Sequence, residues 1–401
     1  MVIVVVIDSF GMGASADAEQ YGDVGAHTAR SAACGGPEGR AVWPTLRDGG
    51  LGNAAALRGD SLPGVPLVDR PRARFGLMVG ASPGKDTVTG HWELAGVVLK
   101  QPLAIFPPEC PSFPRDLIDA FSGEFGTGVL GNHAASGTEV IASLGEEHVR
   151  KNWPIFYTSA DSVIQIAAHE AVVPVERLYA YCQWVRAYCD RKGIAAGRVI
   201  ARPFEGVPGD FRRTSRRKDF SMAMPERGLL PRLNDVGVRT VGVGKIGDIF
   251  NHCGLTEDYP GKGNPACLDR LKRLAKENAE ERSLLFVNLV DTDMVFGHRR
   301  DPQGYHNAVA QVDGVLWEIA ESLKGNDVLI VTADHGCDPG FRGSDHTRED
   351  VPLLAYSRHC RGTGLGIRSS FADLAQSLAA HFGAEQLPVG EAFPLRDGAS
   401  P

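Results

Sequence analysis

Acidic and imidazole side chains gather at three places in the sequence, each preceded by a run of apolar residues. They are Asp8 near the amino terminus, then Asp291, Asp293 and His298, and finally the pairs Asp334-His335 and Asp345-His346. Carboxylate and imidazole ligands without cysteine suit manganese, zinc or iron rather than a structural zinc site. A single Asp-His pair is more often a satisfied polar group in a loop. Three such clusters brought together would repel unless a cation compensates them, so the pattern predicts a centre for two metal ions.

The turn GKDTVTGHWE, residues 84 to 93, offers hydroxyl groups for phosphoryl chemistry. It is not a nucleotide-binding P-loop, because Gly80 stands one residue too close to Lys85 and because Asp86 occupies the Ser or Thr position. A threonine in this turn could attack phosphorus if a metal ion lowered the pKa of its hydroxyl. Thr87 and Thr89 are both candidates on these grounds. For either one, a hydroxyl that only bonds its own backbone is the plainer alternative.

Two other patterns are weaker indications of a ligand. The segment 238 to 250 contains a literal G-x-G-x-x-G, made by Gly242, Gly244 and Gly247, but no second strand ending in an acid follows it as a dinucleotide site requires. Lys245 within it could hold a phosphate as a point charge. The strongest basic run lacks interleaved aromatic residues, which favours a solvated face over nucleic-acid contact. Its members are Arg212, Arg213, Arg216, Arg217 and Lys218.

Composition narrows the class of protein. The chain has 43% apolar and 23% charged residues and a net charge of -7, which is typical of a globular protein and disfavours nucleic-acid or anionic-membrane partners. The start, MVIVVVIDSF, lacks a basic n-region and carries Asp8, so it is read as a buried strand rather than a signal peptide or membrane span. The eight cysteines form no C-x-x-C pair. Reduced thiols in a cytoplasm are therefore expected.

Three apolar runs are expected to position the acidic clusters. They span residues 2 to 8, 283 to 293 and 326 to 336, and each passes directly into an acidic residue. Such runs are typical of strands buried on both faces of a parallel sheet. Ligands bind beyond the carboxyl ends of parallel strands, so the acids would meet there if these strands share a sheet. Residues 267 to 281 and 309 to 323 space their apolar positions by three and four, which predicts helices covering the sheet.

A chain of 401 residues favours two domains. Between about 105 and 222 the composition of the sequence changes. A proline-rich segment is followed there by short apolar segments and the basic run. We therefore expect an inserted second domain at 107–222. The metal-binding core would then be built from 1–106 and 223–401.

Eight segments together resemble the phosphopentomutase family of the alkaline phosphatase superfamily, in the order found in that family. They are IDSFGMGASADAEQYGDVGAHT, GKDTVTGHWELAG, ASGTEVIASLGEEH, YTSADSVIQIAAHE, GRVIARPFEG, GKIGDIF, LVDTDMVFGHRRDPQGY and TADHGCDPGFRGSDHTREDVPLLAYS. The resemblance implies an α/β fold, with an alkaline-phosphatase-like core whose mostly parallel central sheet is flanked by helices. It also implies a smaller inserted α/β cap domain that recognises the sugar phosphate.

The resemblance also implies roles for individual residues. It gives one manganese ion to Asp8, Asp334 and His335, and the other to Asp293, His298 and His346. Thr87 would bridge the two ions as the nucleophile, because the related phosphoglycerate mutases place theirs three residues before a Gly-His pair. Positions that contact the sugar phosphate match Ser159, Asp161, Val163, Arg198, Ile200 and Arg213, with Lys245 nearby.

The implied enzyme is an isomerase of nucleoside catabolism that interconverts ribose or 2-deoxyribose 1-phosphate with the 5-phosphate. It would work through a phosphothreonine and a 1,5-bisphosphate, which also acts as activator. This chain departs from the family's usual residues at four positions, namely Cys337 for Asn, Gly247 for Ser, Ser215 for Pro and Lys218 for His. The alternatives are another phosphomutase or phosphatase of the superfamily, or a non-catalytic dinucleotide or sugar-phosphate binding protein. The sequence leaves sugar preference, metal identity and oligomeric state, a monomer included, open.

Overall fold

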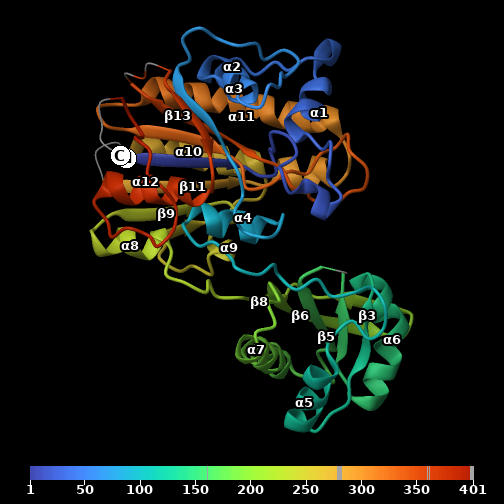
Figure 1. Cartoon of the computed structure of the whole chain (residues 1–401). Coiled ribbons are helices and arrows are strands. Elements are labelled where there is room, and N and C mark those ends of the chain that lie inside the picture. The colour runs from blue at the N-terminus through green and yellow to red at the C-terminus, as the bar shows by residue number, and fades with distance from the viewer. Residues whose placement is uncertain (160, 278–281, 359, 361, 398–401) are drawn as a thin grey trace. The chain divides into compact units, whose positions relative to one another are not determined.

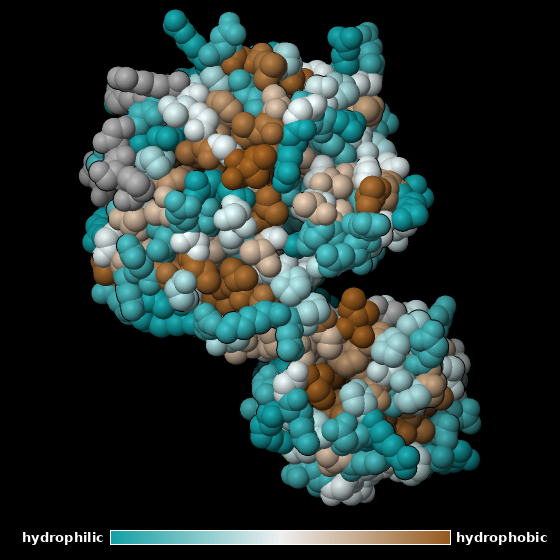
Figure 2. Space-filling model, in the orientation of Figure 1, coloured by the Kyte–Doolittle hydropathy of each residue, from teal (hydrophilic) through white to brown (hydrophobic). Residues whose placement is uncertain are grey.

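The structure is a computed structural model that describes residues 1–397 except 160, 278–281, 359 and 361. The chain divides into two compact units. Unit 1 combines Met1–Gln101 with Met224–Pro401, and unit 2 is the continuous segment Pro102–Ala223. The sequence had placed the insertion at 107–222. Hydrophilic side chains cover most of the visible face of either unit, and hydrophobic side chains appear there as separate patches (Figure 2).

Unit 1 is built on an eight-stranded sheet in the order β10-β9-β11-β1-β12-β13-β2-β14 (Figure 1). Only β13 among these strands runs against the others, since it pairs antiparallel with both neighbours. The central strands are mostly apolar and fully buried, as expected for a parallel sheet covered on both faces. The strands are β1 Val2–Ile7, β2 Ala73–Met78, β9 Arg239–Val243, β10 Glu257–Tyr259, β11 Ser283–Leu289, β12 Val328–Thr332, β13 Val351–Ser357 and β14 Gly364–Arg368.

Helices lie on both sides of this sheet (Figure 1). On one side α11 packs against α1, α2 and α10, and on the other α12 packs against α4 and α8. The α-helices are α1 Thr28–Cys34, α2 Pro44–Gly49, α3 Leu51–Ala56, α4 Thr87–Leu94, α8 Leu229–Asp235, α9 Ile246–Ile249, α10 Asn264–Glu277, α11 Pro302–Ser322 and α12 Ala372–Phe382. Short 3-10 turns cover Ala18–Tyr21 (η1) and Pro37–Gly39 (η2), and Thr292–Gly297 (η3) is a π-helix.

Unit 2 is a smaller α/β layer structure with strands in the order β3-β4-β5-β6-β7, and β8 pairs with β6. Its apolar core lies between the sheet and helices α5 and α7, and a second apolar cluster lies under α6. The strands are β3 Leu130–Ala134, β4 Ile155–Thr158, β5 Val163–His169, β6 Arg198–Val207, β7 Asp210–Arg213 and β8 Lys218–Ser221. The helices are α5 Arg115–Phe125, α6 Gly137–Lys151 and α7 Val175–Lys192.

The predicted α/β class with a mostly parallel central sheet is confirmed. The expected strand at 283–293 was too long, because β11 ends at Leu289 and the chain turns into the π-helix η3. The helix expected at 267–281 begins earlier, at Asn264, and its last four residues lie outside the described part of the chain. The helix expected at 309–323 corresponds to the second half of α11. This helix begins at Pro302, and proline is favoured at the first position of a helix.

Candidate active site

Three neighbouring strands deliver the acidic residues to one edge of the sheet. The strand β1 pairs in parallel with β11 on one side and β12 on the other. Asp8 directly follows β1, Asp293 lies in the π-helix after β11, and Asp334 follows β12. The convergence predicted for the carboxyl ends of these strands is therefore observed.

Asp8, Asp334 and His335 form the first group of possible metal ligands. The Nε2 of His335 lies 3.6 Å from the Oδ1 of Asp8 and 3.4 Å from the Oδ2 of Asp334. None of the three side chains is more than 2% exposed. Two carboxylates and an imidazole are thus held together in a site closed to bulk water.

Asp293 is the centre of a second group. Its Oδ2 lies 3.4 Å from the Nε2 of His298, and its Oδ1 lies 3.3 Å from the Nε2 of His346. The two imidazole Nε2 atoms are 3.1 Å apart. Possible ligand atoms of His335, Asp293 and His346 also lie within 4.8 Å of one another, so the two groups are adjacent. The π-helix accounts for the Asp-x4-His spacing, since its wider turn places Asp293 and His298 on one side.

The electrostatics of these groups fit a divalent cation. Burial and the charges of Asp334 and Asp293 raise the pKa of Asp8 well above its usual range. The Oδ1 atoms of Asp8 and Asp293 are buried and, among the described residues, without a hydrogen-bond partner. The hydrogen bond with Asp293 raises the pKa of His298 to about 9, which shows that the Asp293 carboxylate favours a positive charge beside it. Oxygen and nitrogen donors of this kind suit manganese, zinc or iron.

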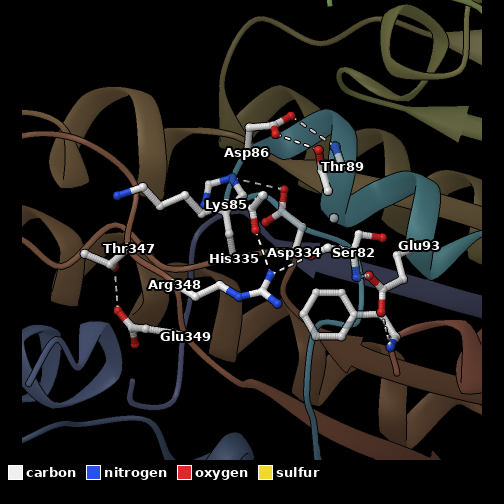
Figure 3. A pocket seen from close by; sticks show the side chains of 13 residues that line it. Ser82, Lys85, Asp86, Thr89, Glu93, Asp334, His335, Thr347, Arg348 and Glu349 are labelled. Carbon is white, nitrogen blue, oxygen red and sulfur yellow. Dashed lines mark hydrogen bonds and ion pairs between the residues drawn. The ribbon is translucent and has the colours of Figure 1, made fainter. Parts of the chain in front are cut away.

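Thr87 opens helix α4 and faces these groups. Its hydroxyl lies 3.2 Å from the Nε2 of His335. The Oγ1 of Thr89 instead donates to the Oδ2 of Asp86 at 2.6 Å, as part of the helix cap in which Asp86 accepts the N–H groups of Val88 and Thr89 (Figure 3). Helix α4 approaches the first group closely, because a Cβ at Gly90 would lie 2.2 Å from the carbonyl oxygen of Asp334. Of the two candidate threonines, only Thr87 therefore contacts a possible metal ligand.

The residues expected to bind sugar phosphate are divided between the units. Lys245 lies in unit 1, where its charge lowers the pKa of Asp8, an effect smaller than the burial that raises it. The other six are in unit 2. Val163 and Arg198 are paired residues on β5 and β6, and Ile200 lies farther along β6. Ser159, Asp161 and Arg213 complete this set.

Polar contacts hold several of these unit 2 side chains in place. The Oδ1 of Asp161 accepts the N–H of Val163 at 2.9 Å, and Arg213 donates to the Oγ1 of Thr138 at 2.7 Å. Sequence reasoning missed Gln165, which donates to the Oγ of Ser159 at 3.0 Å and accepts from Arg202 at 2.9 Å. A glutamine on a strand carries no sequence signal for such a link.

Comparison with known proteins places this chain in a family. The Metalloenzyme superfamily matches residues 1–386. A phosphopentomutase of Desulfitobacterium hafniense is 46% identical over 98% of this chain and 98% of its own length. One of Anaeromyxobacter sp. is 48% identical over 98% of this chain and 97% of its own length, and one of Thermotoga petrophila is 46% identical over 98% of both. The chain belongs to the phosphopentomutase family. The resemblance stated from its motifs is confirmed, and so is the prediction of a mutase of the isomerase class that binds divalent metal.

Within this phosphopentomutase family member, a buried pair that the motifs did not reveal fixes the loop before Thr87. The carboxylate of Glu93 accepts the N–H groups of Ala81 and Ser82 at 2.8 and 2.7 Å. The guanidinium of Arg348 donates to the carbonyl oxygens of Ser82 and Gly84 at 2.9 and 2.7 Å (Figure 3). It also donates to the carbonyl oxygen of Gly80. The carboxylate of Glu93 and the guanidinium of Arg348 thus hold the backbone of this loop, from which helix α4 begins.

The same family member links Thr87 to the metal groups through His91. Asn288 donates to the Oδ2 of Asp8 at 2.8 Å and lies 3.2 Å from the Nε2 of His91. The Nδ1 of His91 lies 2.9 Å from the carbonyl oxygen of Thr87. The four-residue spacing of these two residues within a helix was a signal that could have suggested this contact. Among the described residues, every helix is too short or too polar to cross a membrane.

Proposed function

We propose that this enzyme interconverts ribose 1-phosphate, or its 2-deoxy analogue, with the corresponding 5-phosphate. The observation that carries the proposal is the Thr87 hydroxyl at 3.2 Å from His335, at the edge of the two groups of carboxylates and imidazoles. The relatives that cover nearly the whole chain are named phosphopentomutase, which supports the substrate class.

Thr87 is the residue proposed to carry the phosphoryl group. Asp8, Asp334 and His335 would hold one ion, and Asp293, His298 and His346 the other. Two divalent ions at these ligands, proposed to be manganese, would neutralise the phosphoryl oxygens and lower the pKa of the attacking hydroxyl. A trace of sugar bisphosphate is proposed to phosphorylate Thr87 and so activate the enzyme.

The proposed reaction has two balanced transfers. Phosphothreonine 87 first gives its phosphoryl group to the free hydroxyl of the sugar monophosphate, which forms a 1,5-bisphosphate and regenerates the Thr87 hydroxyl. Thr87 then takes the other phosphoryl group from the bisphosphate, and the isomeric monophosphate leaves. Lys245 is proposed to act near the phosphoryl group as a fixed positive charge, supported by its effect on Asp8.

Recognition of the sugar is assigned to unit 2. Arg213 and Arg198 would bind phosphate, while Asp161 and Ser159 would bind sugar hydroxyls and Val163 and Ile200 would contact the ring. The hydrogen bonds that Arg213 donates to Thr138 and that Gln165 donates to Ser159 support this, because they orient the side chains of Arg213 and Ser159 without a ligand. All eight cysteines are free, which supports the cytoplasm as the expected compartment.

One assay tests the function directly. Purified protein is incubated with manganese, a trace of ribose 1,5-bisphosphate and ribose 1-phosphate, and products are followed by phosphorus NMR. We expect ribose 5-phosphate to accumulate with little inorganic phosphate. Arg213→Ala should weaken substrate use at unchanged metal content, with the exposed Arg212→Ala as the matched control. Inorganic phosphate as the main product would contradict the mutase assignment and favour a phosphatase.

A further inference from the structure

The start of helix α6 in unit 2 is a helix end without a side-chain cap. The helix begins at Gly137, and the N-cap residue Ser136 forms no side-chain hydrogen bond to the first turn. The N–H of Ala135 donates to the carbonyl oxygen of Thr158 at 2.9 Å, which fixes this helix end beside the end of β4. The first N–H groups of a helix have no partner within the helix, so this 15-residue helix offers donors to a ligand.

The hydroxyl of Tyr157 points toward this helix end. A Cβ at Gly137 would lie 2.6 Å from the Oη of Tyr157 and 3.3 Å from an Nη of Arg213. Tyr157 is 0% exposed, and its Oη has no hydrogen-bond partner among the described residues. A buried hydroxyl without a partner costs free energy, so a ligand that supplies the missing bond accounts for it.

Positive charges gather near the same hydroxyl. Burial raises the pKa of Tyr157, and three cations each lower it by a smaller amount, namely Arg202, Arg213 and Arg217. Burial and then the charges of Arg217 and Arg213 lower the pKa of Arg202, so these guanidinium groups repel one another. Arg217 is bonded to Asp219 at 2.7 and 2.6 Å. An anion bound beside Arg202 and Arg213 would offset the remaining repulsion.

The sheet register connects this place to the residues proposed to bind the sugar. Tyr157 on β4 pairs with Gln165 on β5, which in turn pairs with Ile200 on β6. Paired residues of neighbouring strands point to the same face of a sheet, and so do residues two apart on one strand. Tyr157 and Arg202 therefore lie on the face that carries Ile200.

We propose that the first turn of α6, Tyr157 and Arg202 form with Arg213 a pocket for the phosphate group of the pentose phosphate. The inference rests on the proposed function and deepens it. The N–H groups and the dipole of a helix start favour a phosphate dianion, and guanidinium groups bind its oxygens in pairs. The phenol of Tyr157 donates a hydrogen bond to a phosphate oxygen. Glu139, the acidic residue of this turn, is exposed, so water and salt screen its charge.

Calorimetric titration with ribose 5-phosphate tests the pocket without using activity. The variants are made in full-length Thr87→Ala protein with manganese present, so that binding is measured without phosphoryl transfer. Tyr157→Phe should weaken binding about tenfold or more, because a hydrogen bond to a charged group is lost. Its free energy of unfolding should not fall, because the hydroxyl has no partner within the protein. Gly137→Ala should weaken binding at least as much, because its methyl group takes the space between Tyr157 and Arg213.

Tyr188→Phe is the matched control in the same unit. Tyr188 is also buried but belongs to the other apolar cluster, and its hydroxyl donates to the Oδ2 of Asp116 at 3.1 Å. This variant should lose stability and keep its affinity for ribose 5-phosphate, which is the opposite of the result expected for Tyr157→Phe.

An unchanged Kd in both Tyr157→Phe and Gly137→Ala would overturn the pocket. A Tyr157→Phe protein of clearly lower stability would also contradict it, because the hydroxyl would then have a partner inside the protein. Either result leaves the proposed mutase function standing, since that function is judged by formation of ribose 5-phosphate from ribose 1-phosphate in the natural protein. Absence of this turnover contradicts the function, whatever the two variants bind.

Discussion

The Nδ1 of His91 lies 3.0 Å from the Oδ2 of Asp334, with both side chains fully buried. The same nitrogen donates to the carbonyl oxygen of Thr87 at 2.9 Å, so it contacts both residues. Asn288 donates to the other ring nitrogen, which places the proton of the neutral ring on Nδ1. One imidazole thus couples the position of the proposed nucleophile to that of a proposed metal ligand.

We expect His91→Gln to weaken metal binding about 10- to 100-fold and to slow phosphorylation of Thr87, because the ring nitrogen that contacts Asp334 and donates to the Thr87 carbonyl is lost. His91→Asn keeps a donor near the place of Nδ1 and should lose much less. Calorimetric titration with manganese and intact-mass measurement of phosphorylation check both effects. Equal losses in the two variants would show that ring volume, not the Nδ1 donor, is what matters.

Thr87→Ala should abolish both phosphopentomutase turnover and the mass increase of the phosphorylated enzyme. Thr89→Ala should keep the phosphoryl group, because the Thr89 hydroxyl is occupied by Asp86 at 2.6 Å. Its cost should be about 1 kcal/mol of stability, the usual effect of weakening a helix cap. The intact mass of each variant, measured after incubation with bisphosphate, distinguishes Thr87→Ala from Thr89→Ala. A phosphorylated Thr87→Ala protein would disprove the nucleophile.

Glu93→Gln should lower the free energy of unfolding by about 1–3 kcal/mol, because buried N–H groups lose acceptors. The carboxylate also accepts from the Oγ of Ser370 and the N–H of Phe371, at 2.8 and 2.9 Å, and an amide cannot serve all four donors. Urea denaturation measures the change, and the exposed Glu19→Gln is the control. We also expect kcat to fall more than KM rises, since α4 carries Thr87. An unchanged kcat would mean that Glu93 only stabilises the fold.

Chelation of divalent ions should lower the melting temperature of the natural protein, and Asp8→Asn should remove most of that effect. Burial, and then repulsion by Asp334 and Asp293, raises the pKa of Asp8, so in EDTA the variant should be as stable as the natural protein or more so. With manganese at 100 times Kd, binding adds about 2.7 kcal/mol of stability to the natural protein and less to the variant. Thermal melts with and without ion measure this. Asp291→Asn, which weakens the hydrogen bond that Asp291 accepts from the N–H of Asn264, should cost stability equally in both conditions.

His381 should make stability depend on pH on the acid side. Burial, together with the charges of Arg396, the amino terminus and Arg282, lowers its pKa to about 4. The unfolded chain binds the proton below about 6.5 and the folded chain only near 4, so the free energy of unfolding should fall as pH drops through this window. Above 6.5 this contribution is complete. Urea denaturation of the natural protein and His381→Gln from pH 4.5 to 8 checks it, and a parallel pH dependence in the two proteins would rule His381 out.

The sequence predicted secondary structure correctly where a run of one residue type is enough to determine it. Six consecutive apolar residues before Asp8 are enough to predict a buried strand with a carboxylate at its end, and the same reasoning located Asp334. The direction of β13 and the end of β11 at Leu289 could not be predicted in this way, because both depend on how distant segments pair. Periodicity does not reveal where a strand turns into a π-helix.

The site was harder to predict than the fold, because the orientation of the side chains determines which residues belong to it. Thr87 and Thr89 share one helical turn and one chemistry, and only the position of His335 distinguishes them. Glu93 and Arg348 are distant in sequence from each other and form no motif, although together they hold one loop. Cys337 was recognised as a departure from the family, but its proximity to His298 required coordinates.

The position of β1 between β11 and β12 has a consequence for synthesis on the ribosome. Unit 2 is one continuous segment and is complete while both partners of β1 are still untranslated. Until then the nascent chain exposes VIVVVI, an uncharged segment of high β-propensity of the kind that aggregates when unpaired. Recovery of active enzyme should therefore depend on how well chaperones shield the first six strand residues, and overexpression should fail at this strand before it fails in the insertion.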